Sequence, residues 1–412
     1  MSSIAAEGVR IGRRRLLRGA ASLGGTGLLG LGGCVTAAGQ SALGPAQGGA
    51  TYHDPVPPLA PVRAHAGRVF DITVCTRPFR AQGPRLDTET IGDALIVHNY
   101  GHGGSGWSLS WGSSTIAVQK AMASSPREVA VVGCGALGLT SAILAQRAGA
   151  KVTIYARDLY PQVRSARATG SWTPDSRIAL TNAAGPAFGA LWEQMARTSW
   201  KTYRDYLGLP GDPVVFTDRY RLGGSGPNLP APSGDALDFA EYQGSYAPEI
   251  RTTGEQLPPG STPFDWPSVY RSSELMFNLR SYGHLLMTDF LTAGGQFVRT
   301  EFHEPGELAR LPQKVVVNCP GYAAREWWKD QSVAPVRGQI GWLIPQPEVN
   351  YGLYYAGVSV LSRTDGILIQ DLAGGDMKGY GDAGETVDRA ETLNAVARIE
   401  TLFATRFRAR RA

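Results

Sequence analysis

A glycine-rich turn in the first half of the chain constrains its fold more than any other feature. The turn is VVGCGALG (131–138), and a short apolar run, EVAVVG, leads into it as a buried strand would. The residues that follow, LGLTSAILAQRAG, have the pattern of a helix stopped by Gly149, and KVTIYARD then has the pattern of a second strand. Strand, glycine turn, helix and strand in this order predict an α/β fold with a Rossmann-like, dinucleotide-binding domain.

The turn has the spacing G-x-G-x-x-G, in which each glycine has its own physical role. The first permits a tight turn, the second lets a pyrophosphate approach the backbone, and the third allows the helix to pack closely on the strand. The N-terminus of the helix adds partial positive charge. Arg157 or its neighbour Asp158, which follow the second strand, are expected to contact an adenosine ribose. A glycine turn that binds no nucleotide is the alternative. The predicted contacts to the pyrophosphate are Gly133, Gly135, Ala136, Leu137 and Gly138.

A second glycine-rich stretch, HNYGHGGSGWSLSWG (98–112), follows the strand-like run ALIV and precedes a run with a helical pattern. Its glycines permit backbone conformations in which N–H groups approach a flat or anionic ligand closely. His98 and His102 are four residues apart, which on a helix would suggest metal ligands, but they lie in a predicted loop without a third ligand nearby. We therefore predict hydrogen-bonding roles for both histidines and no metal site.

Composition excludes several other classes of protein. The chain has 412 residues, of which 43% are hydrophobic and 18% charged, as in globular proteins. Of the formal net charge of +5, the first 33 residues hold +4 (five arginines and one glutamate), so no nucleic-acid partner is predicted for the nearly neutral remainder. Cys75, Cys134 and Cys319 are widely spaced and include no C-x-x-C pair, which predicts neither a disulfide framework nor a zinc site. The second and third of them are expected to be small buried hydrophobic residues.

The N-terminus is predicted to be a targeting segment rather than part of the fold. RRRLLR, with Arg13 and Arg14 as the pair, resembles a twin-arginine export motif, and the apolar segment after it is too short and glycine-rich to span a bilayer. That segment ends in LGGC, which resembles a lipobox whose cysteine, Cys34, would be acylated; an ordinary cleavage site is the alternative. We predict an export signal over 1–33, a linker over 34–66, and a periplasmic or envelope protein anchored to the membrane at this cysteine.

Several segments together resemble the D-amino-acid oxidase family of FAD-dependent amine oxidases. The segments are VVGCGALGLTSA, IYARDLYPQVRSARATGSWTP, VVVNCPG, APVRGQ, TRPFRAQGPRL and HNYGHGGSGWSLSWG. In that family the fingerprint opens the chain and the last two segments close it, whereas here these two come first. The resemblance therefore implies a circularly permuted D-amino-acid-oxidase-like fold, with FAD as cofactor and a mixed-sheet substrate domain in addition to the Rossmann-like one. The permuted body is assigned to 67–412, its FAD-binding parts to about 92–175 and 284–340, and its substrate-domain parts to about 67–91, 176–283 and 341–412.

The resemblance also implies roles for individual residues. Arg77 would pair bidentately with a substrate carboxylate, a task suited to a guanidinium fork, and a surface ion pair is the alternative. Ser165 matches a flavin-contacting hydroxyl position, whereas Val163 and Arg164 stand where the family often has further hydroxyls. Backbone N–H groups would stabilise the negative charge of the reduced flavin on its pyrimidine side. The residues expected there are Gly103, Gly104, Ser105, Gly106, Trp107 and Ser108.

One position departs from the family pattern. Where the family usually has a tyrosine that helps to hold the substrate carboxylate, this chain has Val358. Tyr354 or Tyr355, a few residues earlier, is expected to compensate. Otherwise, the substrate is not an ordinary D-amino acid.

The activity implied by the resemblance is hydride transfer from the substrate Cα to the flavin, which yields a 2-oxo acid, ammonia and peroxide. The expected substrate is a small D-amino acid or a related amine. Two alternatives stay open: a membrane-linked dehydrogenase that reduces a quinone, and an FAD-binding envelope protein without turnover. The sequence gives neither the substrate side chain nor the oligomeric state.

Overall fold

The computed structural model describes residues 55–223 and 236–408, all within the unit His53–Ala412. The predicted export signal over 1–33, Cys34 and most of the linker lie outside the described residues, so export and lipid anchoring stay predictions. Within the two described ranges, no helix is long and apolar enough to cross a membrane.

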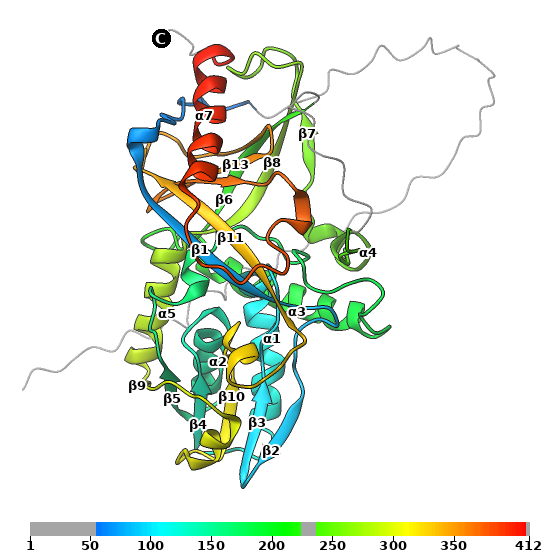
Figure 1. Ribbon diagram of the computed structural model, residues 1–412, viewed down its shortest axis with the longest axis vertical. Helices are drawn as coiled ribbons and strands as arrows, with labels where there is room; N and C mark the ends of the chain where they lie inside the picture. The colour runs from blue at the N-terminus through cyan, green and yellow to red at the C-terminus, as the bar shows by residue number, and fades with distance from the viewer. Residues whose placement is uncertain (1–54, 224–235, 409–412) are drawn as a thin grey trace, which may run out of the picture. The chain divides into compact units, whose positions relative to one another are not determined.

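The fingerprint lies in a six-stranded sheet, which is parallel except for one antiparallel edge strand, β2 (Figure 1). In order across the sheet, the strands are β2 (Thr88–Ile91), β3 (Ala94–His98), β10 (Val315–Asn318), β4 (Glu128–Val132), β5 (Lys151–Ala156) and β9 (Gln296–Arg299). The predicted helix between the two fingerprint strands is α2 (Ala136–Arg147), and Gly149 follows it with a φ of +97°, which favours glycine. The predicted α/β class is thereby confirmed.

The two glycine-rich stretches meet at one edge of this sheet. The first follows β3 and the fingerprint turn follows β4, and β10 pairs in parallel with both of these strands. The carboxyl ends of parallel strands lie at the same edge, where α/β proteins bind their ligands. The sheet therefore brings the two stretches together, although β10 is almost 200 residues further along the chain than β4.

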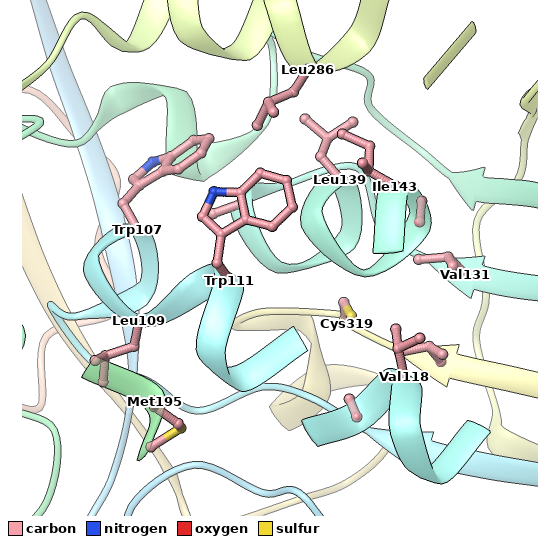
Figure 2. Close-up of a cluster of buried hydrophobic side chains, with 14 of the residues drawn as sticks. Trp107, Leu109, Trp111, Val118, Val131, Leu139, Ile143, Met195, Leu286 and Cys319 are labelled. Atoms are coloured by element: carbon pink, nitrogen blue, oxygen red, sulfur yellow. The ribbon is translucent and has the colours of Figure 1, made fainter. Parts of the chain in front are cut away.

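Helix α1 (Gly106–Ala121) begins inside the stretch 98–112, all of which the sequence predicts as a loop. The structure corrects that prediction: only the part before the helix is a loop. A Cβ added at Gly112 would lie 2.1 Å from the Met195 carbonyl oxygen of α3 (Phe188–Tyr203), so this glycine allows two helices to pack closely. Side chains of α1, α2, α3 and α5 (Leu279–Thr292) share one buried cluster, which includes Trp111 and Leu286 (Figure 2).

A second, eight-stranded sheet carries the remaining strands and is antiparallel except where β12 pairs with β6. In order across the sheet, the strands are β1 (Val69–Arg80), β11 (Val333–Leu343), β14 (Gly366–Asp371), β13 (Val358–Arg363), β12 (Gly352–Tyr355), β6 (Val214–Gly223), β8 (Ser268–Phe277) and β7 (Gly254–Gln256). This is a mixed sheet of the predicted kind. The exact domain boundaries stay a prediction.

The C-terminal helix lies beside the start of the described body. Helix α7 (Arg389–Thr405) packs on β14, β11 and β13, and it contacts the short 3₁₀ helix η1 (Ala66–Arg68), which directly precedes β1 (Figure 1). A permuted chain requires this proximity, because its last helix would connect to the strand that now begins the body. The permutation itself stays a prediction.

Candidate functional site

A cavity of about 600 Å³ opens where both sheets contribute residues. It brings together segments that are far apart in the sequence. They are 75–78 on β1, 102–104 with Gly106 and Trp107, the fingerprint turn 132–137, 155–158 after β5, 163–165 with Ala168, and 300–303 and 319–323. Both glycine-rich stretches and Arg77 thus line one cavity, as the sequence predicts.

The fingerprint turn forms a cradle that side chains would fill. A Cβ added at Gly133, whose φ is +95°, would lie 2.4 Å from the Cys319 carbonyl oxygen, and one added at Gly138 would lie 2.0 Å from the Gly133 carbonyl oxygen. Helix α2 begins at Ala136, whose N–H donates to Ser165 Oγ at 3.1 Å. A glycine turn at a helix N-terminus with a hydroxyl beside it fits the pyrophosphate of a dinucleotide.

Beyond this turn, the cavity continues to the place predicted for the adenosine. Arg157 and Asp158 both line it, and the Arg157 guanidinium donates to Asp158 at 2.9 Å and to Glu301 at 3.2 Å. Residues 300–303 also line this part, and the sequence analysis does not assign them. Their signal was the strand-like run QFVRTEF, because residues that follow a parallel strand reach the same sheet edge as the fingerprint.

The glycine-rich loop differs from the prediction in which amides it offers. The N–H of Gly103 donates to the Pro78 carbonyl oxygen at 2.7 Å and that of Gly104 to the Ser176 carbonyl oxygen at 2.8 Å, so neither is available to a ligand. Gly106 and Trp107 also line the cavity, and they form the first turn of α1, where N–H groups have no acceptor within the helix. The predicted stabilisation of negative charge therefore passes to the start of this helix.

Ser105 and Ser108 are buried but are not among the residues that line the cavity. Ser105 Oγ donates to the Ser176 carbonyl oxygen at 3.1 Å, and Ser108 Oγ accepts from the Thr173 N–H at 2.8 Å. Both hydroxyls therefore fasten the loop to the segment 171–177 and do not face a cofactor. The helical turn that begins at Gly106 directs them away, which the sequence did not reveal.

Arg77 reaches the cavity from β1. Its Nη1 donates to the Arg337 carbonyl oxygen at 3.4 Å, and a Cβ added at Gly338 would lie 2.4 Å from its Nη2, so the guanidinium lies across a glycine of β11. Among residues 55–223 and 236–408, no carboxylate forms an ion pair with it. Burial and the charge of Arg77 lower the pKa of the nearby Arg177 to about 10. An uncompensated, positively charged fork at a cavity suits a carboxylate ligand.

The structure does not bring Tyr354 or Tyr355 to the cavity lining. The Tyr354 hydroxyl accepts a hydrogen bond from Arg219 Nη1, and the Arg219 Cζ lies 4.8 Å from the Tyr354 ring centroid. The Tyr355 ring packs edge-on against Trp266, with 5.3 Å between their centroids. Both phenols belong to the β12–β13 hairpin, in which Tyr355 pairs with Val358. The expected compensation for the missing family tyrosine has no support in this geometry.

The histidines and cysteines behave as predicted. His98 Nε2 lies 2.6 Å from Glu89 Oε1, and His102 Nε2 lies 2.7 Å from Ser113 Oγ, so both have hydrogen-bonding roles. Burial lowers the pKa of His102 to about 3, which keeps its ring neutral. Cys134 and Cys319 are buried free thiols, and burial raises their pKa to about 11 and about 12, so neither is a nucleophile at neutral pH.

The segment 171–177, which holds the glycine-rich loop, includes a strained carboxylate. Asp175 Oδ2 accepts from the Gln243 N–H at 2.9 Å, while its Oδ1 is buried without a partner among the described residues. Burial raises the pKa of Asp175 to about 6. The folded protein therefore binds this proton more tightly than the unfolded chain does, and the stability that this gives at low pH is lost as the pH rises from about 4 to 6.

Asp175→Asn is expected to remove this dependence. At pH 8 the variant should have a free energy of unfolding about 2 kcal/mol higher than wild type, because no buried charge is formed. At pH 4 the two should be equal within error. Urea unfolding at pH 4, 5, 6, 7 and 8 measures the difference; parallel pH profiles for the two proteins would show that the carboxyl is not the cause.

Comparisons with known proteins agree with this site. A family model described as DAO, FAD dependent oxidoreductase, matches residues 128–411. The D-amino-acid oxidase of Rubrobacter xylanophilus is 32% identical over 215 residues, which cover 51% of this chain and 57% of that protein. The D-amino-acid oxidase of Streptomyces coelicolor is 30% identical over 216 residues, which cover 52% and 58%. The chain thus matches a little more than half the length of these curated relatives.

Solved structures of amine-oxidising enzymes are also similar. Iminodiacetate oxidase from Chelativorans sp. BNC1 aligns with a TM-score of 0.47 and 17% identity, over 68% of this chain and 80% of that one. Glycine oxidase from Geobacillus kaustophilus aligns with a TM-score of 0.45 and 14% identity, again over 68% and 80%.

Proposed function

Because the chain belongs to the DAO family of FAD-dependent oxidoreductases, we propose that it oxidises the amine of a small D-amino acid or a related compound. The products would be a 2-oxo acid, ammonia and peroxide. FAD is the family's cofactor, and the glycine cradle at 133–138 fits its pyrophosphate. When bound, FAD supplies the hydride acceptor. The relatives named D-amino-acid oxidase support the choice of substrate.

One observation carries the proposal: Arg77 lines the same cavity as the fingerprint and has no carboxylate partner among the described residues. A substrate carboxylate would complete its fork through two parallel, charge-assisted hydrogen bonds. This fixes the substrate at one end and leaves its Cα to be oriented toward the cofactor. Orientation of this kind supplies a large part of catalysis when the chemistry belongs to a cofactor.

The chain's other residues would contribute electrostatics rather than acid–base chemistry. The first turn of α1, at Gly106 and Trp107, presents unpaired N–H groups and the positive end of the helix dipole to the cavity. Preorganised donors of this kind stabilise negative charge as it develops. The neutral His102 and the protonated cysteines add no competing charge.

Anaerobic mixing of the FAD-loaded protein with single amino acids tests the proposal. We expect one or more D-amino acids to bleach the flavin absorbance and the matching L-amino acids to leave it unchanged. Admitting air should then restore the absorbance and release one peroxide per turnover. Bleaching that an added quinone, but not oxygen, reverses would indicate the membrane-linked dehydrogenase. A flavin that no D-amino acid bleaches would overturn the enzyme assignment and favour an FAD-binding protein without turnover.

A further inference from the structure

One wall of the cavity is the segment 163–168, which contributes Val163, Arg164, Ser165 and Ala168 to the lining. It contains no strand and only a short 3₁₀ helix, so its position depends on bonds from other elements. The indole N–H of Trp107 donates to the Ser165 carbonyl oxygen at 2.8 Å. The segment's other end is held from the eight-stranded sheet.

Arg363, at the end of β13, makes the bonds at that end. Its Nη1 donates to the carbonyl oxygens of Ala168 at 3.0 Å and of Thr169 at 3.2 Å. The chain then turns at Gly170, whose φ is +84° and whose added Cβ would lie 2.3 Å from the Phe277 carbonyl oxygen. One guanidinium nitrogen therefore fixes the backbone exactly where it leaves the cavity wall and enters this turn.

The guanidinium itself is held in a single orientation. Its Nε and Nη2 donate to the two oxygens of Asp365 at 2.9 Å and 2.5 Å, and its Cζ lies 4.9 Å from the centroid of the Trp342 ring. The Arg363 side chain is only 1% exposed. A buried ion pair of this kind pays a large desolvation cost and is a weak source of stability, but its planar fork defines direction.

We propose that Arg363 is a positioning residue for the cofactor: from the eight-stranded sheet, it sets the place of the 163–168 wall and thereby the affinity and environment of bound FAD. It acts through the Ala168 and Thr169 carbonyl oxygens and does not itself line the cavity. Lysine cannot replace it, because an ammonium group is a point donor that cannot bond the carboxylate and both carbonyls in one plane. The inference rests on FAD binding alone and not on the proposed substrate.

Arg363→Lys tests this proposal against a matched control, Arg271→Lys. Arg271 is also buried and also lies on the eight-stranded sheet, where its Nε donates to Glu255 at 3.0 Å, but it is not among the residues that line the cavity. Both variants should unfold at lower urea concentration than wild type. Only Arg363→Lys should raise the dissociation constant of FAD, by about tenfold, and change the visible circular dichroism of the bound flavin.

The proposal is overturned if Arg363→Lys binds FAD within twofold of wild type with an unchanged spectrum, or if Arg271→Lys shows the same change. Should Arg363→Lys fail to fold, Asp365→Asn decides, because it keeps the guanidinium but removes its charged partner. A smaller rise in the FAD dissociation constant then supports the proposal, and wild-type affinity contradicts it. These titrations need no substrate, so their outcome is independent of whether the protein oxidises a D-amino acid.

Discussion

Replacing Arg77 with methionine is expected to lower kcat/KM for a D-amino acid by a factor of roughly 100, equivalent to about 3 kcal/mol of lost binding. Methionine keeps most of the side-chain length but has no donors for the carboxylate. Most of the loss should appear in KM, since both the bound substrate and the transition state keep the carboxylate. Arg77→Lys should fall between the two, because it retains the charge without the fork. Steady-state peroxide production over a range of substrate concentrations measures these effects.

The matched control is Arg310→Met, which removes an exposed guanidinium that pairs with Glu304 at 3.2 Å and does not line the cavity. It should leave kcat/KM within about twofold of wild type, as exposed ion pairs contribute little. The FAD dissociation constant should stay close to wild type in both variants. An Arg77→Met enzyme with an unchanged KM would mean that the carboxylate binds elsewhere, and the proposed substrate orientation would be wrong.

The second large effect is expected at the fingerprint turn. A Cβ at Gly138 would lie 2.0 Å from the Gly133 carbonyl oxygen, and backbone atoms at that distance cannot yield by a side-chain rotation. Gly138→Ala should therefore push α2 away from the turn and raise the FAD dissociation constant by about 100-fold or more. Fluorescence titration of the apoprotein with FAD measures the constant, and far-ultraviolet circular dichroism reports whether the fold survives.

Gly185→Ala is the control for this substitution, because no heavy atom lies within 4 Å of the added Cβ and the residue is outside the cavity lining. It should bind FAD as wild type does. If Gly138→Ala is folded and binds FAD with wild-type affinity, the turn is not the pyrophosphate site. That result would also remove the reason for placing the adenosine near Arg157.

Local pattern was sufficient for the parts of the fold that depend on near neighbours in the chain. EVAVVG, the glycine turn, the helix and KVTIYARD appear as β4, the cradle, α2 and β5, since each is specified by apolar spacing and glycine conformation. The stretch 98–112 was placed at the site correctly, but its helix start was missed. Glycine there serves close helix packing as well as loop flexibility, and composition alone does not separate the two.

The parts of the site that escaped prediction depend on long-range pairing. Residues 300–303 reach the cavity because β9 pairs with β5, a contact between segments about 140 residues apart. Tyr354 was assigned to the substrate by distance along the chain, whereas the hairpin register gives its hydroxyl to Arg219. The part played by Arg363 depends on three elements at once, and no short motif encodes it.

The place of β10 between β3 and β4 has a consequence for how the protein is made. A ribosome completes β3 and β4 more than 180 residues before it reaches Val315, and until then each has an unpaired parallel edge. Such non-local pairing slows folding and exposes sticky intermediates. The two glycine-rich stretches are neighbours in sequence, but they can face one cofactor only after this late strand has inserted between them.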